Sequence, residues 1–295
     1  MHLRLPRRDG RAIGQPPYDY VVVRVMLKAL RTLFGLKPAP AAKLPAVPAG
    51  RRYYVIGDIH GRLDLYDRLI EAIETDDATS TPADSRVILL GDLVDRGADS
   101  AGVIARTKAW QQQRRVRVLA GNHEEMFLAS FEKSEALRHL LKHGGQETLL
   151  SYGFTAKQMH KLDLDEIFEM LPAMIPASER NYIASFEDII IAGDYAFVHA
   201  GVDPARPLDE QKRSDLRWIR DRFLNHEAPL PKVIVHGHTI FDRVMDCGNR
   251  IGIDTGAFRS GVLTALVLEG DQRRVIQACA GDDGVIEIFH GDCGR

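Results

Sequence analysis

An apolar run that ends in a glycine and a polar side chain occurs three times in the first half of the chain: YYVIGD at 53–58, RVILLGD at 86–92 and VRVLAGNHE at 116–124. Short runs rich in β-branched residues are typical of buried strands. Apolar residues at helical spacing follow the first two runs, at 62–74 and 100–113. This alternation predicts βαβ units with parallel strands, whose carboxyl ends share one ligand-binding edge.

The remainder of the chain predicts helices beside the strand ends and then a β-rich half. Residues 125–187 are rich in helix formers and carry turn signals, so we expect a helical insertion there. Strands are predicted at DIII (188–191), YAFVHAG (195–201) and KVIVHGH (232–238), with a helix over 214–224. The closing segments RIGIDTG, VLTALVLEG, RRVIQAC and VIEIFH also have the composition of strands.

Residues 1–50 differ from the rest in charge and composition. They contain nine Lys and Arg against two Asp, a balance of +7, and because the whole chain carries −2, residues 51–295 carry −9. Segment 24–36 (RVMLKALRTLFGL) predicts a short amphipathic helix, and 37–50 (KPAPAAKLPAVPAG) an extended Pro/Ala linker. The helix could contact a membrane surface or a partner, or it could pack loosely, and Met26 is a second candidate start. We expect the catalytic body to begin at Arg51 and to work without this tail.

Composition excludes several classes of protein. The acidic balance of residues 51–295 disfavours a general nucleic-acid binder. No uninterrupted apolar stretch approaches the roughly 18 residues of a membrane-spanning helix. The cysteines, Cys247, Cys279 and Cys293, form no disulfide or zinc-finger pattern, which favours a reducing, cytoplasmic location.

Polar residues of metal-ligand type follow the predicted strands. They are carboxylates, imidazoles and an amide, without a thiolate: Asp58, His60, Asp92, Asn122, His123, His199, His236 and His238. This donor set suits Mn²⁺, Fe or Zn²⁺. It exceeds the needs of one ion, and two ions sharing a carboxylate are a standard device for in-line displacement at phosphorus. Each residue alone has a simpler explanation, such as a turn Asp or a surface His, so the prediction rests on their common place after strands.

Five short motifs resemble those of the calcineurin-like metallophosphoesterases: GDIHG (57–61), GDLVDRG (91–97), GNHE (121–124), HAG (199–201) and HGHT (236–239). Within that superfamily they are similar to the phosphoprotein phosphatases of Ser/Thr type, in their bacterial and phage branch, over about residues 52–269. The resemblance implies an α/β (α+β) fold, a four-layer sandwich of two mixed β-sheets flanked by helices, with a dinuclear metal site at the strand-end loops. It also implies a metal-dependent phosphomonoester hydrolase in which a metal-bridging hydroxide attacks phosphorus in line.

The resemblance further implies a role for each site residue. The ligands of the two divalent ions would be Asp58 and His60 for the first, Asp92 as the bridge, and Asn122, His199 and His238 for the second. His123 would be the general acid, with Asp95 orienting it and favouring its protonated form. Arg96 and, in a looser motif, Arg220 would bind the substrate phosphate. We expect Glu124 to brace the loop and His236 to be structural.

Three functions remain open from the sequence. The favoured one is a Ser/Thr protein phosphatase acting on a phosphorylated protein, with Mn²⁺ as the expected metal. The nearest rival is a dinucleoside polyphosphate hydrolase of the same superfamily or another nucleotide phosphatase; such hydrolases tend to carry Ala at the position of Asp95 and Asp at that of Glu124. A catalytically inactive metal-binding scaffold would be expected to have lost ligands, and the sequence retains every one.

Overall fold

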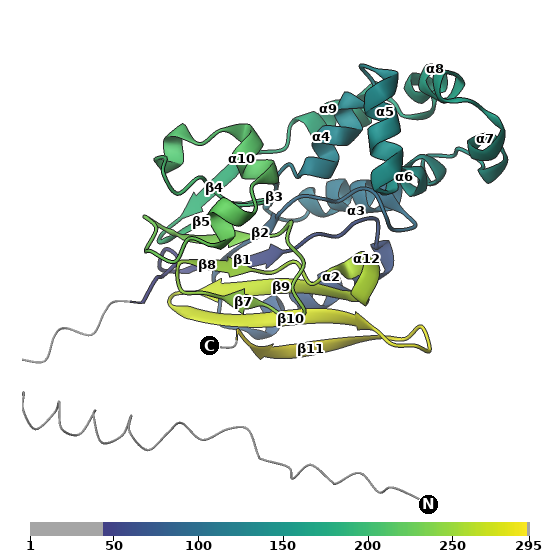
Figure 1. The fold of residues 1–295 in the computed structure, drawn as a ribbon. Coiled ribbons are helices and arrows are strands. Elements are labelled where there is room, and N and C mark those ends of the chain that lie inside the picture. Colours follow the sequence, from purple (N-terminus) through teal and green to yellow (C-terminus); the bar gives the residue numbers. More distant parts are fainter. Residues whose placement is uncertain (1–43, 294–295) are drawn as a thin grey trace, which may run out of the picture. The chain divides into compact units, whose positions relative to one another are not determined.

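The computed structural model describes residues 44–293, which fold around two mixed β-sheets (Figure 1). The first sheet has six strands in the order β11 (Ile286–Asp292), β10 (Gln272–Ala280), β9 (Val262–Glu269), β1 (Arg51–Ile56), β2 (Asp84–Leu89) and β3 (Val116–Val118). The second has five, in the order β4 (Ile189–Ala192), β5 (Tyr195–Val198), β6 (Val233–His236), β8 (Arg250–Gly252) and β7 (Met245–Asp246). β1, β2 and β3 are parallel, as the βαβ pattern predicts, and so are β5, β6 and β8.

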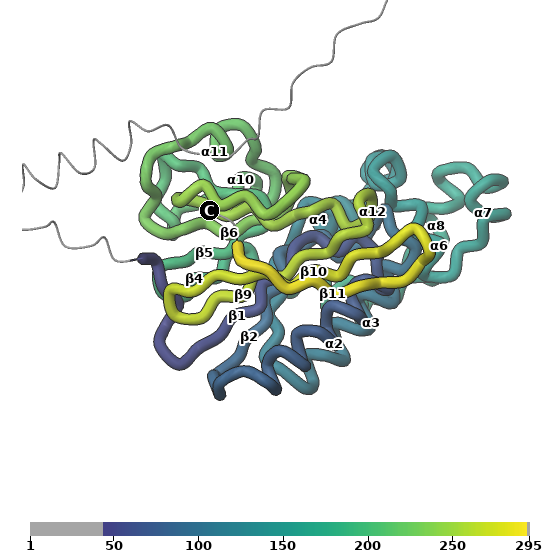
Figure 2. The backbone as a smooth tube through the Cα atoms, turned by 90° about the horizontal axis from the view of Figure 1, so that it is seen from below, coloured from purple at the N-terminus to yellow at the C-terminus, as the bar shows by residue number. Residues whose placement is uncertain are grey.

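Helices cover the outer faces of both sheets. Those on the side of the first sheet are α2 (Leu63–Thr79) and α3 (Ser100–Gln111), and those on the side of the second are α10 (Arg213–Trp218) and α11 (Asp221–Leu224). A short 3₁₀ turn, η2 (Leu208–Glu210), precedes α10, and α12 (Ala257–Ser260) precedes β9. Seen along the layers in Figure 2, the sheets lie between the two groups of helices. The prediction of a four-layer α/β sandwich is therefore confirmed.

Alternating burial along the strands explains the layers. In β1, Tyr54 and Ile56 face the core beneath α2 and α3, whereas Tyr53 and Val55 face the core between the sheets. Because both faces of these strands are covered, they are apolar throughout rather than alternating with polar residues. A third core lies between the second sheet and α10–α11, where Phe223 is fully buried.

The segment 125–187 carries the helices α4 (Asn122–Ala129), α5 (Ser134–Leu140), the π-helical turn η1 (Leu141–Gly145), α6 (Gln146–Ser151), α7 (Ala156–Lys161), α8 (Leu164–Met174) and α9 (Ala177–Ala184). In Figure 1 α5 to α8 extend beyond the sheets, whereas α4 begins at the end of β3. The residues that η1 and α6 bring to the site are described below.

The packed body begins earlier than Arg51. Val47 is 3% exposed within the core between the sheets, and its amide donates to the carbonyl of Gly270 at 3.0 Å. The Asp194 amide donates to the carbonyl of Ala46 at 2.9 Å. The prediction that residues up to 50 form a detached linker is thus wrong for 44–50, because Val47 supplies an apolar anchor within the Pro/Ala run. The predicted helix at 24–36 and residues 37–43 lie outside the described residues.

One predicted helix is split. The segment 214–224 forms α10 and α11 instead of a single helix, because Ile219 is extended and Arg220 has φ −132° and ψ −103°. The break buries Ile219 and leaves Arg220 exposed. Among the helices of residues 44–293, none is both long and apolar enough to cross a membrane.

Candidate active site

The loops after the strands hold an unusual backbone. Within residues 44–293, five non-glycine residues have φ between +48° and +71°, in the left-handed region: His60, Asp92, Asp95, Arg96 and His238. Such conformations cost energy in side chains with a Cβ and tend to persist at functional sites. All five are residues that the sequence predicts for the site, so the strain is an observation independent of the motifs.

Two glycines of the motifs are required by close contact. A Cβ on Gly121 would lie 2.1 Å from Oδ1 of Asp92, and a Cβ on Gly237 would lie 2.0 Å from Oδ1 of Asp58. Neither distance is possible for a real side chain. Glycine therefore allows the loops after β3 and β6 to approach these two carboxylates.

Asp92 lies at the centre of the site. Its Oδ2 is 3.4 Å from Nε2 of His60, and its Oδ1 is 3.4 Å from Nε2 of His199. Two buried groups of candidate metal ligands, each with its donor atoms within 4.8 Å of one another, share this carboxylate: His60, Asp92 and His123, and Asp92, His199 and His238. The shared carboxylate has the place that a bridge between two ions would need, although the first group contains His123 where the prediction has Asp58.

Backbone carbonyls orient two of the imidazoles, and Asn122 lies beside the second donor group. His60 and His199 donate from Nδ1 to the carbonyls of Val94 (2.8 Å) and Leu90 (2.9 Å), which leaves the Nε2 lone pairs facing Asp92. These Nδ1 bonds to carbonyls are the second hydrogen bonds by which metal-ligating histidines are commonly held. Oδ1 of Asn122, an acceptor, lies 2.9 Å from Nε2 of His199 and 2.8 Å from Nδ1 of His238. The donor set at the second group thus fits a divalent cation.

Asp58 lies next to this centre with a partner that the sequence analysis missed. Its Oδ2 accepts from the amide of His238 at 3.0 Å. It lies against Asp254, whose Oδ1 accepts from the amide of Gly256 at 2.8 Å. Burial raises the pKa of Asp58, and the charges of Asp254 and Asp92 raise it further. Asp58 is outside the two close groups, but three buried carboxyl groups side by side call for compensating cations.

His123 and Asp95 form the predicted pair. Nδ1 of His123 donates to Oδ2 of Asp95 at 2.7 Å, and Oδ1 of Asp95 accepts from the hydroxyl of Thr148, in α6, at 2.6 Å. Burial lowers the pKa of His123 to about 4, although the charge of Asp92 opposes this. Burial also raises the pKa of Asp95 to about 7, against the hydrogen bond from Thr148. Desolvation therefore sets the direction of the shift in the pKa of His123 in this structure, and the expectation that Asp95 favours the protonated imidazole stays a prediction.

Arg96 lies between the imidazoles. Its guanidinium donates to Nε2 of His60 at 3.0 Å and to Nε2 of His123 at 2.9 Å, and it stacks over Phe258 at 4.5 Å from the ring centroid. Its amide donates to the carbonyl of Gly144 at 2.8 Å. The insertion therefore fixes the backbone of Arg96 through η1.

The charge of Arg220 acts on the second donor group. Burial is the main reason that the pKa of His238 is lowered, and the positive charge of Arg220 adds to that shift. The exposed Arg220 thus lies within electrostatic reach of the second donor group. Two further residues have the structural places expected of them. Glu124 is fully buried and accepts from the amides of Gly121, Asp92 and Leu93, and His236 lies against the rings of Phe223 and Phe241.

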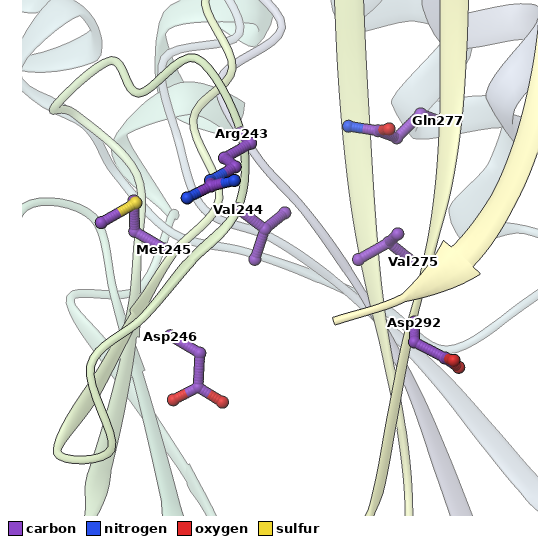
Figure 3. A pocket seen from close by; sticks show the side chains of 7 residues that line it. All are labelled: Arg243, Val244, Met245, Asp246, Val275, Gln277 and Asp292. Carbon is purple, nitrogen blue, oxygen red and sulfur yellow. The ribbon is translucent and has the colours of Figure 1, made fainter. Parts of the chain in front are cut away.

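A cavity beside strand β7 is separate from this site. It has a volume of about 410 Å³ and lies between the segment 243–246 and strands β10 and β11, as Figure 3 shows. Its lining residues are Arg243, Val244, Met245, Asp246, Val275, Gln277 and Asp292, and they include no residue predicted for catalysis or metal binding.

Comparisons with known proteins agree with this geometry. The family model of the calcineurin-like phosphoesterases matches residues 51–259. The chain is 30% identical over 223 residues to serine/threonine-protein phosphatase 1 of Salmonella typhimurium, covering 72% of this chain and 90% of that protein. It is 28% identical over 238 residues to an asymmetrical bis(5'-nucleosyl)-tetraphosphatase of Bacillus velezensis, covering 72% and 87%.

The fold has a matching counterpart among solved structures. A putative diadenosine tetraphosphatase superposes with a TM-score of 0.51 at 21% identity, covering 85% of this chain and all of that one. The motifs and the named activities of these relatives agree on phosphoester hydrolysis, and the donor groups of this chain fit divalent cations. This chain belongs to the calcineurin-like phosphoesterase family, with the phosphoprotein phosphatase motifs that its sequence predicts, and it is a phosphoester hydrolase.

Proposed function

We propose that this chain is a protein phosphatase that hydrolyses phosphoserine and phosphothreonine with two divalent metal ions, taken here as Mn²⁺, with Fe or Zn²⁺ as alternatives. The observation that carries the proposal is the placement of the His123–Asp95 pair and Arg96 beside Asp92, the carboxylate that the two groups of candidate ligands share. A proton donor, an anion-binding guanidinium and a bridging carboxylate are the parts needed to expel an alkoxide from phosphorus.

The ligands of the first ion would be Asp58, His60 and Asp92. Asp92, Asn122, His199 and His238 would hold the second. Bound there, the ions would supply a water of lowered pKa and neutralise charge on the phosphoryl oxygens. In the structure the guanidinium of Arg96 donates a hydrogen bond to Nε2 of His60. Arg96 must therefore turn away from His60 for that nitrogen to serve as a ligand, and this movement frees the fork of Arg96 for the phosphoryl group.

His123 would protonate the leaving oxygen from Nε2, and this nitrogen must first take up a proton, because in the structure it accepts from Arg96 and burial lowers the pKa of the ring to about 4. The turn of Arg96 toward the phosphoryl group would free Nε2 for that proton. Nδ1 of His123 is tied to Asp95, and Nε2 is the atom that faces Arg96, where the phosphoryl group would lie. Arg220 would bind the phosphoryl group from the side of the second ion. Asp95 acts through His123 by holding the ring, and Thr148 acts through Asp95.

The substrate class is the finer part of the proposal. The 30% identity to the Salmonella protein phosphatase supports a phosphoprotein as the substrate. Asp95 and Glu124, each with buried hydrogen-bond partners, support the same substrate class. The similarity to a tetraphosphatase favours a nucleotide phosphoester as the second candidate. An inactive scaffold is disfavoured because all six predicted ligands are retained. We expect action in the cytoplasm and no binding of nucleic acid.

Leaving-group dependence tests this mechanism. We expect His123→Asn to lower kcat for a phosphoserine peptide by about 10²–10⁴-fold, the usual worth of a general acid, and to lower kcat for 4-nitrophenyl phosphate less, because its phenolate leaves without a proton. Metal content is measured in the same samples. Equal losses on both substrates, or a parallel loss of metal, would remove His123 from the acid role. A panel that adds phosphothreonine and phosphotyrosine peptides and diadenosine tetraphosphate decides the substrate class.

A further inference from the structure

Four arginines gather at the end of the first sheet that is opposite to the metal site. Arg51 begins β1 and Arg115 directly precedes β3, while Arg86 is the third residue of β2 and Arg117 the second of β3. The site residues follow the carboxyl ends of these parallel strands. Seven residues of extended chain separate Arg51 from Asp58, which corresponds to about 20 Å. A ligand bound among these arginines would therefore not touch the catalytic residues.

The arginines occupy the face of the sheet that is apolar farther along. Tyr53 pairs with Arg86, and Ile88 pairs with Arg117, so these side chains share the face that turns toward the second sheet. Like charges on neighbouring strands are unfavourable without compensation. Arg86 and Arg117 lie at the rim of this face with 26% and 45% of their side chains exposed, so an anion from solvent can reach their guanidiniums.

A cavity opens between these arginines and the edge of the second sheet. It has a volume of about 250 Å³, and its lining combines the four guanidiniums with apolar groups: Tyr53, Val87, Ile88, Ile190 and Ile191. Tyr53 and Ile190 are buried, whereas Ile191 is 53% exposed at the edge. A pocket with a cationic rim and an apolar floor suits an anion that is attached to an apolar body.

Two carboxylates compensate the four positive charges only in part. Asp84 lies 2.8 Å from Arg86, 3.2 Å from Arg115 and 3.7 Å from Arg51, and Glu187 pairs with Arg117. Among the described residues these ion pairs leave a balance of +2. They also leave donors available, because Arg86 uses Nε and Nη2 for Asp84 while its Nη1 makes no hydrogen bond within residues 44–293.

We propose that this pocket binds the phosphoryl group of a small phosphorylated molecule. A phosphate monoester carries close to two negative charges at neutral pH, which matches the uncompensated charge. Planar guanidinium forks bind phosphate oxygens in pairs. The phosphoryl group could be that of free phosphate or that of a nucleotide, and the apolar floor favours the latter. The site is separate from the metal centre and does not depend on the substrate class proposed above.

Calorimetric titration of the full-length, metal-loaded protein tests the proposal, with inorganic phosphate and α,β-methylene-ADP as separate probes. We expect the native protein to bind one more equivalent of probe than the variant Arg86→Gln/Arg117→Gln, or to bind that equivalent at least tenfold more tightly. Hydrolysis of 4-nitrophenyl phosphate should be equal in the two proteins. Tighter binding of α,β-methylene-ADP than of phosphate at this equivalent identifies a nucleotide as the source, and equal binding identifies free phosphate.

The control is Arg68→Gln/Arg106→Gln, which removes two arginines that pair with Glu71 and Asp67 elsewhere on the surface. It should bind as the native protein does. Arg86→Lys/Arg117→Lys keeps the charge but not the forks and should bind more weakly. Equal binding by the native protein and the glutamine variant, or native-like binding by the lysine variant, would overturn the proposal. Should the double variant fail to fold, Arg115→Gln provides the same test, because that side chain is 70% exposed.

Discussion

The hydroxyl of Thr148 links the helical insertion to the proposed acid. It is fully buried, donates to Oδ1 of Asp95 at 2.6 Å and accepts from the amide of Asp95 at 2.8 Å. The substitution Thr148→Val keeps the shape of the side chain and removes these two hydrogen bonds together with a third, to the hydroxyl of Ser100 at 3.0 Å. Asp95 would retain Ser100 as a partner for its amide at 3.0 Å, so its backbone stays in place while its carboxylate becomes free to turn.

The expected loss in kcat follows from the hydrogen bond between the Thr148 hydroxyl and the Asp95 carboxylate. A hydrogen bond to a charged group contributes about 1.5–3 kcal/mol. If it acts wholly by holding Asp95 against His123 in the transition state, its removal lowers kcat by about 10–100-fold, since roughly 1.4 kcal/mol corresponds to tenfold. We expect this loss on a phosphoserine peptide, a smaller loss on 4-nitrophenyl phosphate, and a smaller effect than that of His123→Asn. Thr148→Ser should restore most of the activity.

Thr107→Val is the matched control. Thr107 is also fully buried, and its hydroxyl bonds to the carbonyl of Val103 and contacts Tyr66, away from the site. Steady-state kinetics on both substrates, together with urea unfolding, separate stability from catalysis. A threonine that merely packs would make the two valine variants alike, with kcat changed equally on both leaving groups. That result would refute the reasoning.

Three further predictions concern metal, stability and the chain boundary. Asp92→Asn should abolish activity and lower the metal content at both positions, as measured by elemental analysis, because both donor groups share this carboxylate. A protein that begins at Leu44 should match the full chain in unfolding temperature and turnover, whereas one that begins at Arg51 should lose at least about 1.5 kcal/mol, the value of a buried valine. Burial raises the pKa of Asp76, but hydrogen bonds, chiefly from Arg274 at 2.6 Å, outweigh it and leave the pKa lowered. Asp76→Asn should therefore lower the free energy of unfolding by about 1.5–3 kcal/mol at pH 7. The difference between the two proteins should shrink as the pH falls below about 4, because the carboxyl group of the unfolded chain becomes protonated there. Urea titrations at each pH measure this difference.

The sequence was sufficient for those parts of the site in which a ligand directly follows its own strand. Asp92 and His199 come one or two residues after apolar runs, and the common edge of a parallel sheet brings such positions together. Asp254 follows the strand of RIGIDTG in the same way and could have been found by the same signal. That strand has only three residues, and its aspartate stood in no motif that was assigned a role.

Other features could not be predicted from local patterns. Thr148 lies 53 residues from Asp95, and a single threonine in a helical segment has no periodicity that points to a distant carboxylate. The break between α10 and α11 depends on the burial of Ile219 in the third core, which a helical pattern does not reveal. Val47 lies in a run of Pro and Ala whose composition is that of a linker, and only its tertiary contacts show otherwise.

The strained loops and the rigid layers depend on each other. Five residues in the left-handed region cost on the order of 1–3 kcal/mol each, so together they approach the whole net stability of a typical domain. The loops cannot keep this conformation by themselves, and buried strands on both sides of them must impose it. Leu90 illustrates the coupling: its side chain is buried in the core between the sheets, while its carbonyl fixes the ring of His199. The apolar strand before each motif therefore positions the site side chains that the motif provides. For this reason a strand and its ligand recur together as one unit along this chain.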